Sequence, residues 1–136
     1  MTVLIDTDVL LDVALDRHPY SEAAGALLSA VEQRRMRGFV AWHALSNFHY
    51  LVAPRGGKSS AREFVAELAV FVEVAPTTTE SLRYALRLPM KDFEDAMQVA
   101  AAAACHADLI ATRNLKDYLN SPVKAVAPET VLASEF

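Results

Sequence analysis

Acidic and amide side chains follow two of the apolar segments that the sequence predicts to be buried strands. Asp6 comes directly after Val3–Ile5, and Thr112–Asn114 ends the apolar segment that begins at Asp108. Asp95 lies in the first turn of the helix predicted before that second segment. Ligands of open α/β sheets bind beyond the carboxyl ends of the strands, so these positions can share one pocket if the two strands are neighbours. Clustered carboxylates need protons or a cation between them, and oxygen ligands favour Mg²⁺ or Mn²⁺.

Each acid also has a purely structural interpretation. Asp6 could cap the helix that follows it, and Asp8 falls in a first helical turn, where the helix dipole favours any acid. Asp92 has the position of a helix N-cap with an acid three residues later, and capping is the role we favour for it. The sequence alone leaves Asp95 open between capping and metal binding. Two further acids are expected to be solvated: Asp12 and Asp16.

Other kinds of site find little support. The four histidines include no pair four residues apart, as a helical zinc site needs, and one cysteine cannot form a thiolate cluster. Neither a G-x-G-x-x-G segment nor a P-loop is present, and Gly56–Gly57 is typical of a plain turn. Three aromatic side chains could stack on nucleic-acid bases, although aromatic residues on a short helix more often belong to a core: Trp42, Phe48 and Tyr50.

The elements that would position these residues alternate along the chain. Apolar segments rich in branched residues predict strands, and amphipathic segments bounded by Pro, Gly, Ser or Thr predict helices. The predicted strands are Val3–Ile5, Phe39–Ala41, Phe71–Val74, Asp108–Thr112 and Val123–Val126. The first predicted helix starts at Asp8 with Thr7 as its cap. The other predicted helices are Ser21–Met36, His43–Val52, Ala61–Val70, Glu80–Leu88 and Asp92–His106. A loop is expected at Pro54–Ser60, and a short helix or turn at Asn114–Leu119.

This order of elements predicts the fold class. Strands alternating with helices form βαβ units, which build a parallel sheet covered on both faces. We therefore expect an α/β fold, a three-layer α/β/α sandwich with a mostly parallel sheet of about four or five strands. The sequence shows no internal repeat and no long linker, so residues 1–136 are expected to form a single domain.

Bulk composition limits the classes of function. Of 136 residues 53% are hydrophobic, and 17 acids against 13 bases give a net charge of −4. This balance argues against binding nucleic acid through bulk positive charge, although cations at an acidic site would compensate. One cysteine suits a reducing cytoplasm, and the chain lacks the pattern of a signal peptide or of a membrane helix. We therefore expect a cytoplasmic protein.

Three segments, in order, resemble the PIN-domain family, including the VapC-like toxin ribonucleases of toxin–antitoxin pairs: IDTDVLLD, KDFEDAMQVAAA and ADLIATRNLKDY. The resemblance covers nearly the whole chain, and the ordered set is more specific than any one segment. It implies a divalent-metal-dependent endoribonuclease that hydrolyses RNA phosphodiester bonds and acts as the toxin of such a pair. It also implies an antitoxin partner and, as in many relatives, a homodimer.

The resemblance further assigns site residues. The family holds one or two divalent ions, here Mg²⁺ or Mn²⁺, with about four acids. Asp6 matches the first acid, and Asp95 matches the acid at the start of the helix before the fourth strand. Asn47 and Asn114 stand where the other two acids are expected, and an amide oxygen can ligate a hard cation without adding charge. This chain fits a D-F-E-D variant of the family better, in which nearby acids would make up the missing charge: Asp92 and Asp117.

Side chains around these acids would assist metal-assisted hydrolysis, in which the ion lowers the pKa of a water and screens developing charge. Thr7, Thr112 and Asn114 would position water or a ligand carboxylate. Arg113 or Lys116 would contact the substrate backbone, although both could equally be solvated surface bases.

Two other functions remain open. The asparagines could mark a PIN-like module that has lost catalysis and binds only RNA or a protein. A phosphate-accepting receiver domain is disfavoured, because no suitable aspartate follows a middle strand and no lysine follows a late one. A dimer face could be supplied by residues that could equally be core: Leu27, Leu28, Val31, Phe64 and Leu68.

Overall fold

The computed structural model describes residues 1–134, apart from the side chains of Lys58 and Ser59. Five described strands form one all-parallel sheet in the order β3-β2-β1-β4-β5. The strands are β1 (Thr2–Ile5), β2 (Arg37–Val40), β3 (Glu73–Val74), β4 (Leu109–Ala111) and β5 (Ala125–Val126). The helices are α1 (Thr7–Ala14), α2 (Ser21–Glu32), α3 (Trp42–Gly56), α4 (Lys58–Leu68), α5 (Thr79–Arg87), α6 (Phe93–Ala104), the 3₁₀ helix η1 (Leu115–Tyr118) and α7 (Pro128–Ala133).

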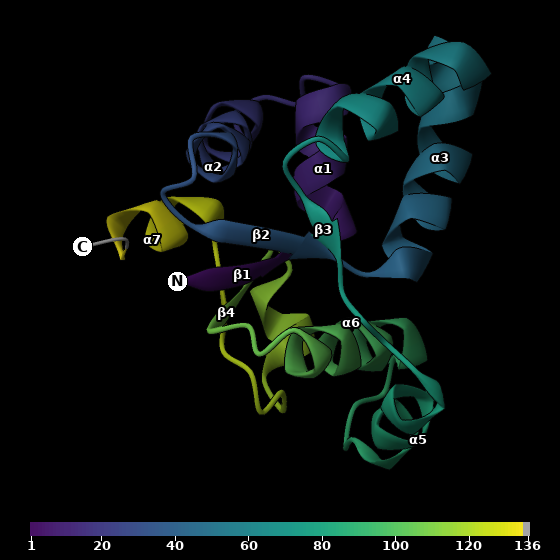
Figure 1. Cartoon of the computed structure of the whole chain (residues 1–136), viewed down its shortest axis with the longest axis vertical. Helices are drawn as coiled ribbons and strands as arrows, with labels where there is room; N and C mark the ends of the chain where they lie inside the picture. Colours follow the sequence, from purple (N-terminus) through teal and green to yellow (C-terminus); the bar gives the residue numbers. More distant parts are fainter. Residues whose placement is uncertain (135–136) are drawn as a thin grey trace.

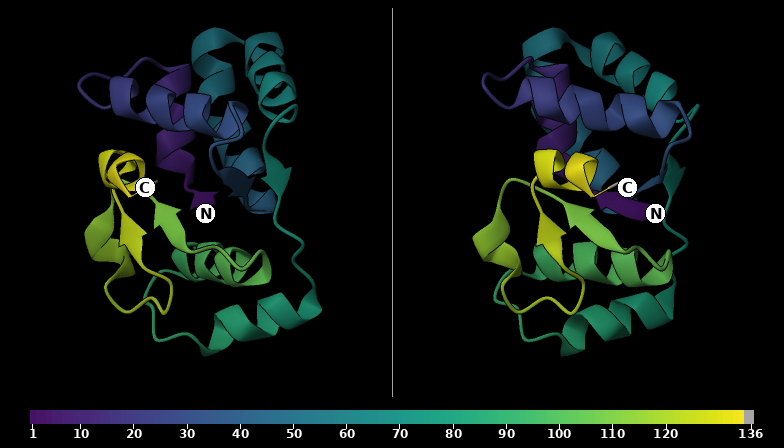
Figure 2. Two further views of the ribbon diagram at one scale, coloured as in Figure 1. Left: turned by 60° about the vertical axis from the view of Figure 1, so that its left-hand side comes forward. Right: turned by 90° about the vertical axis from the view of Figure 1, so that its left-hand side faces the viewer.

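Helices cover both faces of this sheet, so the predicted three-layer α/β/α sandwich is confirmed (Figure 1). Side chains alternate along β1, and Val3 and Ile5 pack into the core beneath α1, α2 and α7. Leu4 points the other way, into a core that includes Val99 and Ala102 of α6. The turned views show α6 lying against the sheet with α5 outside it (Figure 2). The central strand is thereby buried on both faces, as in other parallel sheets.

Gly38 of β2 allows α2 to pack directly on the sheet. A Cβ atom at this position would lie 2.8 Å from Cγ1 of Val31 and 3.3 Å from Cδ1 of Ile5. A distance of 2.8 Å is shorter than real Cβ contacts, so a larger residue at this position would require Val31 to shift.

Several predicted boundaries are wrong. Helix α3 continues through Pro54 to Gly56, so most of the predicted Pro54–Ser60 loop is helical. Proline removes one helical hydrogen bond near the end of α3, and the chain then reverses at Gly57, whose φ is +89°. The short helix α7 was not predicted, although Pro128 at its first turn is a typical start signal.

The pairing of β1 with β4 positions the ends of both strands side by side. Ile5 pairs with Ala111, and the backbone N–H of Asp6 donates to the Ala111 carbonyl at 3.0 Å. The next residue of each strand, Asp6 and Thr112, therefore leaves the sheet at the same edge. β1 and β4 are therefore neighbours, the condition under which the residues that follow them can share one pocket.

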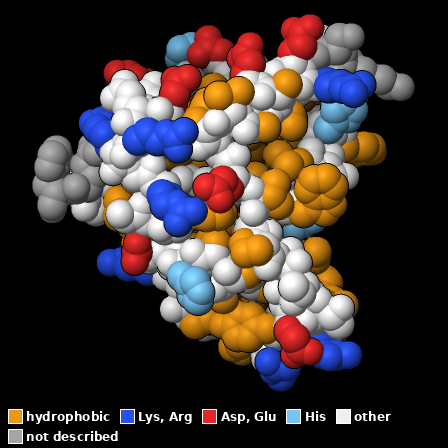
Figure 3. Space-filling model, in the orientation of Figure 1, with side chains coloured by type: hydrophobic (Ala, Val, Ile, Leu, Met, Phe, Trp, Pro, Cys, Tyr) orange, Lys and Arg blue, Asp and Glu red, His pale blue; other side chains and the backbone are white. Residues whose placement is uncertain are grey.

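Hydrophobic side chains remain at the surface in several places, some of them on the face seen in Figure 3. Trp42 and Tyr50 of α3 are exposed, whereas Phe48 lies in the core and stacks on Phe64. Of the five residues weighed as a dimer face, four are buried in the core and Phe64 is partly buried against it. Among the described residues, no helix combines the length and apolar character needed to cross a membrane.

Candidate functional site

Asp6 is the centre of a buried hydrogen-bond cluster. Its Oδ1 accepts from the backbone N–H of Thr7 at 2.7 Å and from Nε2 of Gln98 at 3.1 Å. Its Oδ2 accepts from the hydroxyl groups of Thr112 at 2.8 Å and Tyr118 at 3.1 Å. Asp6 is also the N-cap of α1, and 8% of its surface is exposed. Four donors therefore hold the carboxylate in one orientation.

The environment of Asp6 is nevertheless unfavourable for a negative charge. Burial raises the pKa of its carboxyl above the ordinary value, although hydrogen bonds from Thr112 and Thr7 act in the opposite direction. All four donors are neutral groups, so none of them supplies a counter-charge. A cation beside Asp6 would offset the cost of burying this carboxylate.

Asp8 shares the Thr112 hydroxyl with Asp6. The Asp8 Oδ2 atom accepts from the backbone N–H of Arg113 at 2.8 Å and lies 3.2 Å from the Thr112 hydroxyl oxygen. One hydroxyl proton can serve only one of the two carboxylates at a time. Burial, and then the charge of Asp6, raises the pKa of Asp8 to about 6. A protonated Asp8 Oδ2 can donate to the Thr112 oxygen, which leaves the Thr112 proton for Asp6, whereas Asp8 Oδ1 is buried without a described partner.

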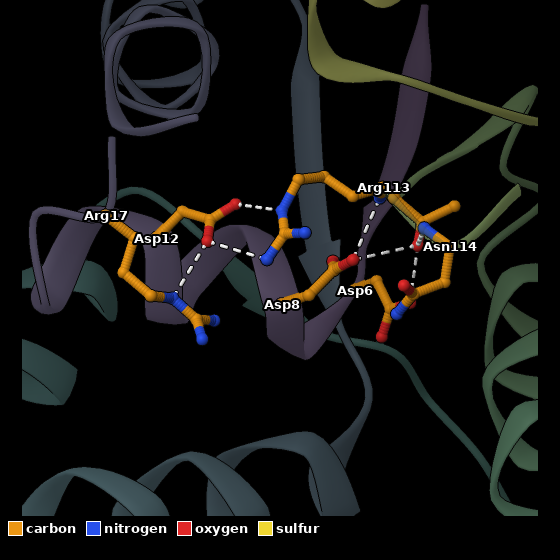
Figure 4. A network of polar contacts seen from close by, with 7 residues as sticks. Asp6, Asp8, Asp12, Arg17, Arg113 and Asn114 are labelled. Atoms are coloured by element: carbon orange, nitrogen blue, oxygen red, sulfur yellow. Dashed lines mark hydrogen bonds and ion pairs between the residues drawn. The ribbon is translucent and has the colours of Figure 1, made fainter. Parts of the chain in front are cut away.

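The prediction that Asp12 is solvated is wrong. Its exposed fraction is 0%, because two arginines cover it. Nε of Arg113 lies 2.6 Å from Oδ2 of Asp12, and Nη2 of Arg113 lies 3.0 Å from Oδ1 (Figure 4). Nε of Arg17 contacts the same Oδ1 at 3.0 Å. The Arg113 guanidinium also lies 3.9 Å from the ring centroid of Tyr20. Arg113 is thus neither a solvated base nor a group turned toward the pocket.

A cavity of about 330 Å³ opens beside Asp6. Its polar lining comes from four elements and includes three carboxylates and two amides: Asp6, Thr7, Asn47, Glu94, Asp95 and Asn114. Leu11, Tyr50 and Leu51 complete the lining. The amide Nδ2 of Asn47 donates to Oε1 of Glu94 at 2.8 Å, so α3 and the start of α6 are joined across the cavity. The cavity therefore gathers oxygen donors from distant parts of the chain.

Negative charge accumulates around Asp95. Burial raises the pKa of its carboxyl to about 7, and the remaining causes are the charges of four acids: Asp92, Asp117, Asp6 and Glu94. Carboxylates that raise one another's pKa in this way are the arrangement that a bound cation relieves.

The structure brings together five of the residues singled out from the sequence: Asp6, Thr7, Asn47, Asp95 and Asn114. Thr112 lies behind them, fully buried against Asp6. Asp92 caps α6 by accepting from the Asp95 backbone N–H at 3.1 Å, as expected, and neither it nor Asp117 lines the cavity. Thr7 is not the helix cap, because Asp6 has that position, and the Thr7 hydroxyl is buried without a described partner.

Three residues of the site were missed in the sequence. Glu94 immediately precedes Asp95 on α6, and successive helical residues do not normally face the same way. Gln98 had a usable signal, since it is a polar residue three positions after Asp95 in an otherwise alanine-rich helix. Tyr118 had none, because its contact with Asp6 spans 112 positions of the chain.

The donor set fits a hard divalent cation in its chemistry. Carboxylate and amide oxygens are the ligands that Mg²⁺ and Mn²⁺ prefer, and no cysteine or histidine lines the cavity. Within residues 1–134, no three or more His, Cys, Asp or Glu side chains are already gathered closely enough to hold an ion. Binding an ion would therefore require these side chains to converge on it.

Comparisons with known proteins agree with this fold. A family model described as PIN domain matches residues 2–116. Among the solved structures, one is VapBC2 from Rickettsia felis bound to a DNA fragment from the VapBC2 promoter. It superposes with a TM-score of 0.74 at 15% identity, over 93% of this chain and 98% of that one. VapC20 from Mycobacterium tuberculosis, described as a sarcin-ricin loop cleaving toxin, superposes with a TM-score of 0.64 at 18% identity, over 79% of this chain and 86% of that one. FitAcB from Neisseria gonorrhoeae superposes with a TM-score of 0.62 at 16% identity, over 93% of this chain and 98% of that one. None of the curated proteins matches the sequence.

Proposed function

Because this chain belongs to the PIN domain family, we propose that it is a divalent-metal-dependent nuclease that hydrolyses RNA, and that it is the toxin of a toxin–antitoxin pair. The observation that carries the proposal is the convergence of Asp6, Glu94 and Asp95 on one cavity. Likeness to a toxin described as cleaving the sarcin-ricin loop supports an RNA substrate.

Asp6 and Asp95 are the proposed ligands of the ion, and Glu94 supplies a third carboxylate. Asn47 donates an amide N–H to Glu94, which leaves its amide oxygen as a neutral ligand. Asn114 offers a second amide. Glu94 thus compensates for the acid that the family pattern expects at position 47. When bound, Mg²⁺ or Mn²⁺ lowers the pKa of a water molecule and stabilises charge that develops on the phosphate.

The remaining residues orient the ligands. Thr112, Gln98 and Tyr118 fix both oxygens of Asp6, as partners of metal ligands commonly do. Asp117 adds negative charge near Asp95 from η1, which raises the attraction for a cation. Asp92 holds the first turn of α6 and thereby positions the backbone of Asp95.

Tyr50 favours a single-stranded substrate. It lines the acidic cavity and 79% of its surface is exposed. Unpaired bases stack on exposed aromatic rings, whereas bases inside a duplex are not free to do so. The tyrosine ring would bind a base beside the phosphate that is cut. Stacking would also supply affinity that the basic side chain of Arg113 cannot, since Asp12 already binds it.

Cleavage of single-stranded RNA in the presence of Mn²⁺ tests the proposal. The wild-type protein should cut the RNA, and Asp6→Asn and Asp95→Asn should each lose most of this activity. Glu63→Gln, an exposed acid on α4, is the matched control and should cut normally. Equal cleavage by all four preparations would indicate a contaminating nuclease and contradict the proposal.

A second candidate function, binding of RNA without cleavage, is favoured by one observation. Each oxygen of Asp6 already accepts two hydrogen bonds, so an ion must compete with these donors. RNA that is bound in a gel-shift assay but stays intact with Mn²⁺ would support this function over hydrolysis.

An antitoxin and a second copy of the chain are the proposed protein partners. Light scattering after size-exclusion chromatography measures the mass of the purified protein, for comparison with the 14.9 kDa of one chain. A mass of one chain at all concentrations would contradict the proposed homodimer. Co-expression with any small reading frame found beside this gene, followed by purification of a stable complex, tests the antitoxin.

A further inference from the structure

Asp12 and Arg113 form a partly buried ion pair that lies beside the cavity without lining it. Each carboxylate oxygen accepts from one guanidinium nitrogen: Oδ2 from Nε at 2.6 Å and Oδ1 from Nη2 at 3.0 Å. This two-pronged geometry is the strongest form of an arginine–carboxylate pair. The ring of Tyr20 covers the guanidinium, and Asp12 itself is fully buried. The pair is therefore far more constrained than an ion pair at the surface.

Arg113 is bound to α1 twice, once through its side chain and once through its backbone. Its guanidinium binds Asp12, and its N–H donates to Asp8. The N–H of the next residue, Asn114, donates to the Thr112 hydroxyl at 3.1 Å. Thr112 in turn donates to Asp6. A continuous set of contacts thus runs from Asp12 to the proposed metal ligand (Figure 4).

The turn Thr112–Asn114 depends on these side chains. The N–H of Thr112 still bonds within the sheet, to Val126 of β5. The next two N–H groups, at Arg113 and Asn114, bond to side-chain oxygens instead. Once the chain has left the sheet, its path is therefore set by side-chain acceptors, not by the strand pairing.

We propose that Asp12 and Arg113 act as a positioning clamp, which fixes the Thr112–Asn114 turn against α1 and so sets the geometry of Asp6 and Asn114. The clamp rests on the proposed function, since the ligands it positions are those of the proposed metal centre. Neither residue touches the metal or the substrate. Arg113 is a positioning residue and does not bind RNA.

Arg17 provides a matched control, because it contacts the same Asp12 carboxylate but has no described contact with the turn. Arg17→Met removes one ion pair of Asp12 and leaves the two-pronged contact intact. Arg113→Lys keeps a positive charge at position 113 but cannot reproduce the planar fork. Asp12→Asn is a third variant, and it is used only if it unfolds at a temperature near that of the wild type.

Three measurements on the full chain test the clamp. Mn²⁺ affinity should fall about 10–100-fold in Arg113→Lys, the range typical for partners of metal ligands, and should stay within about twofold in Arg17→Met. Hydrogen exchange at the amides of residues 113 and 114 should accelerate in Arg113→Lys only. In RNA cleavage, kcat should fall more than KM rises, because the substrate does not contact Arg113.

The outcomes separate the clamp from the proposed function. If Arg113→Lys and Arg17→Met have equal effects on Mn²⁺ affinity and amide exchange, the contact between Asp12 and Arg113 is an ordinary ion pair and the clamp is overturned. A rise in KM alone for Arg113→Lys would make Arg113 an RNA-binding residue and also overturn it. If the wild type binds no Mn²⁺, the proposed function fails, and amide exchange alone then decides whether the turn is clamped.

Discussion

Replacing Asp8 with asparagine should remove a pH-dependent penalty on folding. Burial raises the pKa of Asp8 to about 6 from the ordinary 3.8, so the folded protein binds this proton more tightly than the unfolded chain. The stability that the proton provides is complete below pH 3.8 and is lost as pH rises toward 6. A difference of about 2 pKa units corresponds to about 3 kcal/mol, an upper value because Asp6 titrates together with Asp8.

Asparagine is a suitable replacement because it has nearly the same shape. Its amide oxygen can still accept from the Arg113 N–H, and its amide nitrogen replaces the Asp8 Oδ1 atom, which has no described partner. Asp8→Asn should therefore match the wild type at pH 4, or be slightly less stable. At pH 7 it should be more stable by about 1–3 kcal/mol.

Urea unfolding without divalent metal, at intervals between pH 4 and pH 8, measures this difference. Subtracting the two curves cancels the contribution of Asp95 to first order, whereas that of Asp6 changes because Asp6 titrates together with Asp8. Asp16→Asn, which removes an acid with 77% of its side chain exposed, should give a difference of less than about 0.5 kcal/mol at every pH. A flat difference for Asp8→Asn, or a relative loss of stability as pH rises, would refute the argument from burial.

Three further substitutions test the fold and the site. Tyr118→Phe removes one hydrogen bond to the buried Asp6 carboxylate and should lower the unfolding free energy by about 1.5–3 kcal/mol in urea, and an unchanged midpoint would mean that the bond is not formed. Gly38→Ala places a methyl group 2.8 Å from Val31 and should cost about 1–3 kcal/mol in thermal unfolding, whereas a neutral effect would show that α2 can move away. Tyr50→Ala should raise KM for single-stranded RNA by about 5–150-fold, equivalent to about 1–3 kcal/mol, while Tyr50→Phe keeps the ring and should stay near the wild type. Equal KM values for all three proteins would exclude stacking.

Much of the sheet could be predicted because its signals are local. Val3–Ile5 is a run of branched apolar residues ended by an acid, and the structure buries it at the centre of the sheet. The end of α3 was predicted too early because Pro54 was interpreted as a stop. A proline near a helix end costs only one hydrogen bond, and tertiary packing can hold the helix together.

The site was less predictable because its contacts are non-local. Asp12 was expected to be solvated from its spacing within α1, yet it is buried by an arginine 101 positions away. Tyr118 reaches Asp6 from η1 without any sequence signal, and Gln98 reaches it from α6, where its polar side chain in an alanine-rich helix was the only indication. Glu94 was visible in the D-F-E-D segment, but its place in the lining of the cavity and its hydrogen bond from Asn47 emerge only from the structure.

A crystal of the protein soaked in millimolar Mn²⁺, with anomalous diffraction recorded at the manganese edge, tests the central proposal most directly. We expect an anomalous peak in the cavity, with carboxylate oxygens of Asp6 and Asp95 about 2 Å away. Crystals that take up manganese elsewhere, or that leave the two carboxylates without an ion at this concentration, would contradict it.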